Sequence, residues 1–258
     1  MKKYCWIALA GILLVSCKRR SNDYQKVFSD PVLYCKTVKQ LNDVVLENNF
    51  PPMIGSRNYA YANIAAYECI AAGDNRFQSL AGQLNKLPEM PKPDTADGKQ
   101  VDFHLAALLA FTKVGNAVTF PEGSLMGYYD VLKHMADSVG MPSDILNNTV
   151  TFSDSIVSTV MAWSKKDNYA QTRSAEKFAV TDEEGRWVPT PPMYAQAVEP
   201  HWKEMRCLVM DSCGEFMPPR PPQYNMKDSN SAFCKAAVEV MKVGDSLTED
   251  QKYIADFW

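Results

Sequence analysis

The side chains that could do chemistry are few and scattered. None of the three histidines, His104, His134 and His201, has a second histidine or a cysteine at a zinc-binding spacing such as HExxH or CxxC. The sequence also lacks a G-x-S-x-G nucleophile elbow and a P-loop. Four acidic residues invite a paired-carboxylate site, but no spacing brings them together: Glu68, Asp74, Asp154 and Asp167. The sequence therefore predicts no catalytic residue, no cofactor-binding residue and no metal ligand of these kinds.

Two stretches combine aromatic, charged and proline residues at high density. The first runs from Ser56 to Glu68 as SRNYAYANIAAYE. The second comprises Asp167–Arg173, Gly185–Tyr194 and Glu199–Trp202. Taken on their residue types alone, they predict an aromatic, proline-fixed strap with embedded arginine and aspartate that packs across a helical bundle.

The same residues resemble the vanadium-dependent haloperoxidase and type 2 phosphatidic acid phosphatase superfamily, in its exported bacterial branch. The resemblance is carried in order by five segments: Arg57–Glu68, Tyr169–Arg173, Trp187–Pro192, Glu199–Trp202 and Ile254–Trp258. It implies a parent enzyme that either oxidises halide with peroxide through vanadate or hydrolyses a phosphate monoester.

The catalytic motifs of that superfamily do not carry over to this sequence. In the Lys-x6-Arg-Pro motif, Arg220-Pro221 finds Cys213 where lysine is needed, and no histidine follows a Ser-Gly pair. In the Arg-x5-His-x3-Asp motif, Arg57 is followed by Asn63 and Tyr67. The resemblance thus implies the N-terminal helical part of such a protein, inactive alone and with no cofactor in this chain. A missing C-terminal catalytic half would bind vanadate in a haloperoxidase, or phosphate in a phosphatase.

The N-terminus predicts export and lipid anchoring. Lys2 and Lys3 precede an apolar run that is shorter than the roughly 20 residues of a membrane span. Leu14 and Ser16 then occupy the positions that a lipoprotein signal peptidase needs before Cys17. We therefore expect a signal peptide over residues 1–16, lipidation of Cys17, a tether over 17–28, and a location in the cell envelope, at the periplasmic face or the outer membrane.

The composition of the mature chain indicates which classes of binding partner to expect. Beyond residue 16 the chain keeps an acidic balance, so nucleic-acid binding is not indicated. Membrane lipid, reached through Cys17, is the partner that the sequence does indicate, and the oligomeric state stays open. Cys207 and Cys213 are a candidate disulfide, with buried free thiols as the alternative.

Helical periodicity dominates the rest of the chain and predicts an all-α bundle without significant sheet. Helices are expected from Asp30-Pro31 to about Glu47, after Pro51-Pro52, over the apolar stretches near 101–112 and 125–135, from 142 to about 163, over 229–243 and from Thr248. Residues 167–227 are expected to form a long ordered loop, because five large aromatics there could bury surface: Trp187, Tyr194, Trp202, Phe216 and Tyr224. We take 29–258 as one helical domain, apparently truncated before a catalytic half.

One rival interpretation belongs to another functional class. A helical surface lipoprotein that binds glycans for import would also begin with a lipid-anchoring cysteine. Trp187, Tyr194 and Trp202 would then form a sugar platform. No helical repeat of about 34 residues supports this alternative.

Overall fold

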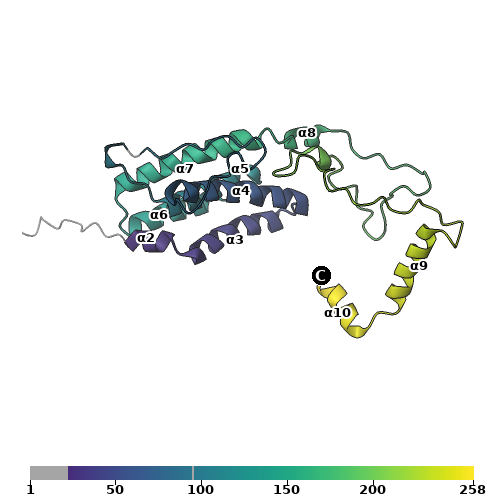
Figure 1. The fold of residues 1–258 in the computed structure, drawn as a ribbon. Helices are drawn as coiled ribbons and strands as arrows, with labels where there is room; N and C mark the ends of the chain where they lie inside the picture. The colour runs from purple at the N-terminus through teal and green to yellow at the C-terminus, as the bar shows by residue number, and fades with distance from the viewer. Residues whose placement is uncertain (1–22, 95) are drawn as a thin grey trace, which may run out of the picture. The chain divides into compact units, whose positions relative to one another are not determined.

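The computed structural model describes residues 23–94 and 96–258, so the predicted signal peptide and Cys17 lie outside the described residues. Within the described ranges the chain folds into nine α-helices and two short 3-10 turns, with no strand (Figure 1). The all-α prediction is confirmed. The helices are α2 (Asp23–Phe28), α3 (Pro31–Glu47), α4 (Pro52–Gly73), α5 (Phe103–Val118), α6 (Met126–Ser138), α7 (Ser143–Ser164), α8 (Tyr169–Ser174), α9 (Ala232–Asp245) and α10 (Glu249–Phe257).

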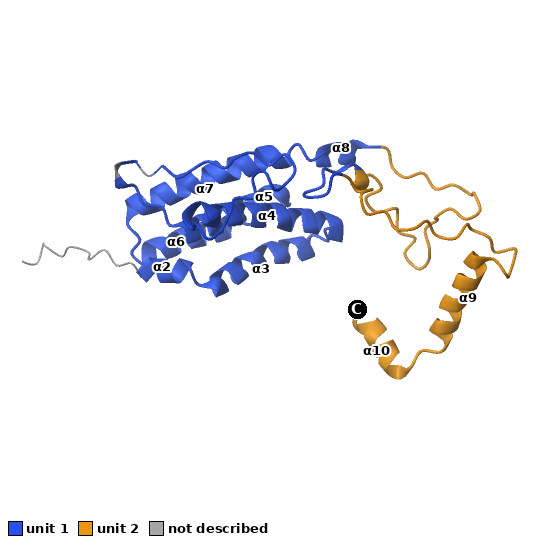
Figure 2. Cartoon of the chain, in the orientation of Figure 1, with its two compact units in different colours: residues 1–175, 204–211 blue, residues 176–203, 212–258 orange. Residues whose placement is uncertain are grey.

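The chain divides into two compact units where the sequence suggested one domain (Figure 2). Unit 1 comprises residues up to 175 together with 204–211, and unit 2 comprises 176–203 and 212–258. Unit 1 holds the helical bundle α2 to α8, and unit 2 holds an irregular stretch with α9 and α10.

Helix α5 is the central element of unit 1. It packs against α3, α4, α6 and α7, and its residues from Leu105 to Phe111 are all buried. A helix that is apolar on every side belongs in a core. Small side chains such as Ala62 and Ala66 on α4 and Ala110 on α5 are buried in this core and allow close approach of the two helices.

Local signals fix several helix ends as expected. The carboxylate of Asp30 accepts a hydrogen bond from the backbone N–H of Val32 at 2.9 Å, and Pro31 opens α3. At α10, Thr248 and Gln251 form both hydrogen bonds of a capping box. These two predictions from the sequence are confirmed.

The structure corrects the second half of the predicted tether over residues 17–28. Residues 23–28 form α2, and both Tyr24 and Phe28 are only 3% exposed. They join a second core cluster with Leu105, Leu109 and other residues of α5, α6 and α7. Six residues are too few to display a helical period, so the two aromatics gave no pattern that the sequence analysis could detect.

The burial expected for the aromatics of residues 167–227 is also corrected. Of the five aromatics named for this stretch, Trp187, Tyr194, Phe216 and Tyr224 are exposed, and Trp202 is partly buried. Within unit 2, Trp187 does contact Phe178, with ring centroids 5.6 Å apart. No helix among the described residues combines the length and apolar character needed to cross a membrane.

Candidate functional site

Asp167, just after α7, is the centre of a buried polar cluster in unit 1. One carboxylate oxygen, Oδ2, accepts hydrogen bonds from Arg57 Nε at 2.7 Å and from the Tyr61 hydroxyl at 2.8 Å. The other oxygen accepts from the backbone N–H of Tyr169 at 2.9 Å. The side chain of Asp167 is 2% exposed and that of Arg57 is 10% exposed. This is a buried, hydrogen-bonded ion pair between residues 110 positions apart in the sequence.

Aromatic rings enclose the Arg57 guanidinium. Its carbon lies 4.2 Å from the ring centroid of Tyr169 and 4.8 Å from that of Tyr61. Arg173 lies over the same Tyr169 ring, at 4.8 Å. A planar guanidinium stacks well on the faces of such aromatic rings.

Arg206 adds a third chain segment to this cluster. Its guanidinium donates to the Tyr61 hydroxyl and to the carbonyl of Trp163, both at 3.0 Å, and lies 4.2 Å over the Trp163 ring. Its backbone N–H donates to the carbonyl of Asp167 at 3.0 Å. The cluster therefore ties α4, the end of α7 and the segment 204–211 together.

The environment of Tyr61 makes its hydroxyl hard to ionise. Burial raises the pKa of Tyr61 well above its usual range, and the neighbouring Asp167 carboxylate raises it further, while Arg206 and Arg57 act in the opposite direction. The hydroxyl donates to Asp167 and accepts from Arg206, so the neutral side chain of Tyr61 connects the two charged side chains by hydrogen bonds.

This cluster is built to hold structure. Arg57 and Arg206 both direct guanidinium donors to protein acceptors, and the Asp167 carboxylate has three donors. Of the residues in the two dense stretches, the structure brings Arg57, Tyr61, Asp167, Tyr169 and Arg173 together in unit 1. Residues 185–194 and 199–202 belong to unit 2, so the predicted strap as a whole stays a prediction. Arg206 was not singled out from the sequence, because it follows no helical period and belongs to no motif.

The three histidines belong to different parts of the chain, two in unit 1 and one in unit 2. His134 is exposed on α6, and His201 in unit 2 has its Nε2 2.6 Å from the carbonyl oxygen of Glu176. His104, at the start of α5, lines a cavity in unit 1. Throughout residues 23–94 and 96–258, no three His, Cys, Asp or Glu side chains gather as metal ligands would.

The four acidic residues noted in the sequence have separate roles. Glu68 is buried and accepts from the Ser79 hydroxyl and the Leu80 N–H, at 2.8 and 2.7 Å, so it fixes the loop after α4. Asp154 pairs with Lys113, and Asp74 pairs with Arg76. These contacts account for each carboxylate in structural terms.

The candidate disulfide is not formed in the structure, where Cys207 and Cys213 are both free thiols. Cys207 lies in a segment held to unit 1, since the Asn85 side chain donates to its carbonyl at 3.1 Å and the Asn85 N–H donates to Leu208 at 2.8 Å. Cys213 is exposed and belongs to unit 2. The short separation of the two cysteines in the sequence did not indicate that they belong to different units.

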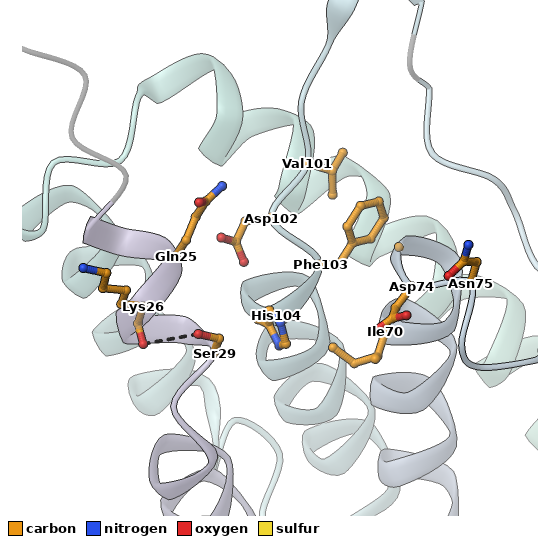
Figure 3. Close-up of a pocket in the computed structure, with 11 residues that line it drawn as sticks. Gln25, Lys26, Ser29, Ile70, Asp74, Asn75, Val101, Asp102, Phe103 and His104 are labelled. Atoms are coloured by element: carbon orange, nitrogen blue, oxygen red, sulfur yellow. Dashed lines mark hydrogen bonds between the residues drawn. The ribbon is translucent and has the colours of Figure 1, made fainter.

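A cavity of about 700 Å³ opens at the end of the bundle where α2, α4 and α5 meet (Figure 3). His104 lies between α2 and the C-terminal end of α4, with Asp102 and Phe103 beside it. Asp74 and Asn75, which directly follow α4, also line the cavity, as do Gln25 of α2 and Ser29, which directly follows α2. This cavity is one of the hollows of unit 1 that could accept a ligand, and the buried ion-pair cluster does not line it.

Comparison with solved structures shows what this arrangement is similar to. The crystal structure described as the first bacterial vanadium-dependent iodoperoxidase superposes with a TM-score of 0.77 at 34% sequence identity. The match covers 85% of this chain and 51% of that protein. The chain has a vanadium haloperoxidase-like fold. No family model and no curated protein matches it.

The resemblance inferred from the sequence is therefore confirmed at the level of the haloperoxidase superfamily. The chain spans about half the length of the haloperoxidase that it matches.

Proposed function

We propose that this chain is the helical part of a membrane-anchored enzyme of the vanadium haloperoxidase and phosphatidic acid phosphatase superfamily, and that it does not catalyse alone. The single observation that carries the proposal is the similarity to a bacterial iodoperoxidase, which covers most of this chain and half of the other. Halide oxidation by peroxide is the favoured reaction of the whole protein, and phosphate monoester hydrolysis is its alternative.

The residues present do not suit vanadate. An oxyanion of that charge needs converging cationic donors with free hydrogen-bonding capacity. In the cationic cluster described here, Arg57 donates to the Asp167 carboxylate and Arg206 donates to the Trp163 carbonyl and the Tyr61 hydroxyl, while Arg206 Nε is buried without a hydrogen-bond partner. The Asp167 carboxylate at the centre of this cluster would repel an oxyanion. We therefore assign vanadate or phosphate binding to a catalytic half outside these 258 residues.

Within the whole protein, we assign a positioning role to the described bundle. Hydrogen bonds of the Asp167 cluster join α4, the chain directly after α7 and residues 204–211. A rigid helical body is a suitable support for reactive groups supplied by another segment.

The second part of the proposal is a lipid anchor at Cys17. Cleavage before Cys17 and attachment of lipid to its thiol would hold the enzyme at the outer face of a membrane, within the cell envelope. Replacement of Cys17 by serine should move the protein from the membrane fraction to the soluble fraction and abolish incorporation of radioactive fatty acid. Unchanged labelling of the Cys17→Ser protein would contradict lipid anchoring at this residue.

The enzymatic proposal is tested by comparing two proteins. One is the 258-residue chain, and the other is the full product of the open reading frame in genomic DNA, read past the codon for Trp258. Each is incubated with vanadate, peroxide and iodide or bromide, and separately with a chromogenic phosphate monoester. We expect turnover only from the longer product.

Two results would contradict this expectation. Turnover by the 258-residue chain that survives repurification would show that it holds a complete site. A stop codon directly after Trp258, or an inactive longer product, would refute the assignment of a catalytic half.

Glycan binding is retained as a second candidate because Trp187 and Tyr194 of unit 2 are exposed. Exposed aromatic rings can stack on sugar faces. A glycan array probed with wild type and Trp187→Ala distinguishes the two candidates, since loss of a specific signal in the variant would favour the platform.

A further inference from the structure

The two helices of unit 2, α9 and α10, lack a hydrophobic core of their own (Figure 2). Within unit 2, which the structure describes throughout, Cys234 is the only buried residue. The two helices do not pack closely against each other, and no residue of α10 is buried. They have 14 and 9 residues, and helices of up to about 15 residues are marginal in water when isolated. Both helices therefore need a surface that covers them.

Each of the two helices carries a row of exposed apolar residues. The rows, which we call the α9–α10 surface, are Ala236, Val240 and Val243 in α9 and Tyr253, Ile254 and Phe257 in α10. Spacings of three and four residues place the members of each row on one side of their helix. Asp250 also lies on this side of α10, in the first turn, where a carboxylate interacts favourably with the helix N-terminus. Exposed apolar rows on two successive helices indicate a surface that another part of the protein covers.

The similarity to the iodoperoxidase structure indicates what covers this surface. The match covers 85% of this chain, which is too much to leave out unit 2, so the shared fold includes part of unit 2. The same match covers 51% of the other protein, and about half of that protein's length therefore has no counterpart in these 258 residues. A helix buries its apolar side against another element of the same fold, so the remaining half is the natural cover for both rows.

The charges of α10 do not favour a membrane surface as the cover. The helix contains three acidic residues, Glu249, Asp250 and Asp256, and one basic residue, Lys252. Lys252 is paired with Glu249, with 2.8 Å between Nζ and Oε1. Amphipathic helices that lie on membranes are rich in lysine and arginine on their polar side, which attracts them to anionic lipids. The acidic balance of α10 therefore favours a protein surface.

We propose that the catalytic half of the whole protein docks on the α9–α10 surface and buries Val240, Ile254 and Phe257 at the contact. The inference rests on the proposed function, which assigns such a half to a segment outside these 258 residues. It deepens that proposal because it names the residues of this chain that hold the two halves together. In the 258-residue chain alone, the same residues are in contact with water.

Hydrogen–deuterium exchange measured by mass spectrometry tests the docking. Two proteins are compared at low concentration: the 258-residue chain, and the full product of the open reading frame read past the codon for Trp258. We expect the amides of α10 and of residues 240–245 to exchange about tenfold or more slowly in the longer product, because docking suppresses local opening. The amides of residues 105–111, in the core of α5, should exchange equally slowly in both proteins and show that unit 1 is folded.

Two variants of the longer product locate the contact. The double substitution Ile254→Asp and Phe257→Asp places two carboxylates in the apolar row of α10, where docking would have to bury them. It should return the exchange of α10 to the rate seen in the 258-residue chain. The matched control is Val131→Asp, which changes a similarly exposed apolar residue of α6 and should leave α10 protected. Exchange in α5 establishes whether each variant is folded.

Lysine cross-linking of the unaltered longer product supplies a readout that needs no variant. Lys242 and Lys252, which lie in α9 and α10, should cross-link to lysines beyond Trp258. Absence of these cross-links, or protection of α10 that persists in the folded double variant, would overturn the proposal. So would protection of α10 in the 258-residue chain, whether alone, on forming a dimer, or on adding phosphatidylglycerol vesicles.

Failure of the docking and failure of the proposed function give different results. An active longer product in which α10 exchanges as fast as in the 258-residue chain would overturn the docking alone. An inactive longer product with a protected α10 and the expected cross-links would support the docking and refute only the assigned catalysis. A stop codon directly after Trp258 would overturn both.

Discussion

Arg57 Nε and Asp167 Oδ2 lie 2.7 Å apart in the interior of unit 1, although 110 residues separate them in the chain. Asp167 also accepts from Tyr61, and its own carbonyl accepts from the backbone N–H of Arg206. This buried long-range contact joins Arg57, one of the residues by which the sequence first suggested its superfamily, to Asp167 of the second dense stretch.

Removing the charge at Asp167 should destabilise unit 1. Because the pair is buried, Asp167→Asn leaves an uncompensated arginine and should cost about 3 kcal/mol in the free energy of unfolding. The matched control is Asp43→Asn, which breaks the exposed Lys39–Asp43 pair and should cost less than about 0.5 kcal/mol. Urea unfolding followed by circular dichroism measures the free energy of unfolding of both variants. Equal decreases in the two variants would show that the buried pair contributes no more to stability than the exposed pair.

Stability should fall at alkaline pH because of Tyr61. Its pKa is raised in the folded state, so above the usual tyrosine value of about 10 the unfolded chain releases a proton that the folded chain keeps. The unfolded state then binds fewer protons, and the free energy of unfolding decreases as pH rises. Burial of Tyr34, which raises its pKa to about 12, adds to the same trend.

The substitution Tyr61→Phe should therefore flatten the alkaline slope of stability. At neutral pH it should cost ~1–3 kcal/mol, since Asp167 and Arg206 each lose a hydrogen-bonding partner. Tyr253→Phe, at an exposed site in α10, should leave the slope unchanged. Unfolding curves at several pH values between neutrality and pH ~11 decide the matter, and an unaltered slope in Tyr61→Phe would assign the alkaline loss to other groups.

Two glycine substitutions in helices should have opposite effects. A methyl group on Gly73 would meet the Phe103 ring and force it to move, so Gly73→Ala should destabilise the protein by about 1–3 kcal/mol. Nothing lies near the corresponding position on Gly127, and Gly127→Ala should stabilise α6 by up to ~1 kcal/mol. Thermal melts of the two variants should move in opposite directions, and a shift of the same sign would contradict the packing at Gly73.

Glu68 should hold the loop that follows α4. Replacing it with alanine removes the acceptor of the Leu80 N–H and the Ser79 hydroxyl, so amide exchange at Leu80 should become faster by about tenfold or more. The exposed Glu89 is the control, and Glu89→Ala should leave exchange at Leu80 unchanged. Protection that persists in Glu68→Ala would mean that other contacts order the loop.

Local rules predicted the helices well. Asp30 with Pro31, and Thr248 with Gln251, signal helix starts through interactions within a few residues, and both signals correspond to observed caps. Apolar periodicity likewise marked α3 to α7. These features depend on short-range chemistry that a sequence displays directly.

The cluster could be predicted only in part. The residue types of Arg57 and Asp167 were conspicuous, but their pairing depends on how α4 and α7 pack, which periodicity does not specify. Arg206 has no local signal at all, and the hydrogen bonds that Tyr34 and Tyr59 make between α3 and α4 depend on how these two helices pack. Tertiary contacts of this kind require the structure.

The hydrogen bonds at 167–168 and 204–206 have a topological consequence. Arg206 N–H meets the Asp167 carbonyl at 3.0 Å and Asn168 Nδ2 meets the Glu204 carbonyl at 3.1 Å, so the chain that departs after Ala175 returns to its own starting point. Residues 176–203 thus lie within a loop whose two ends are joined by hydrogen bonds. Lengthening such a loop costs only about 0.6 kcal/mol per doubling, so insertions and deletions can accumulate there without disturbing the bundle.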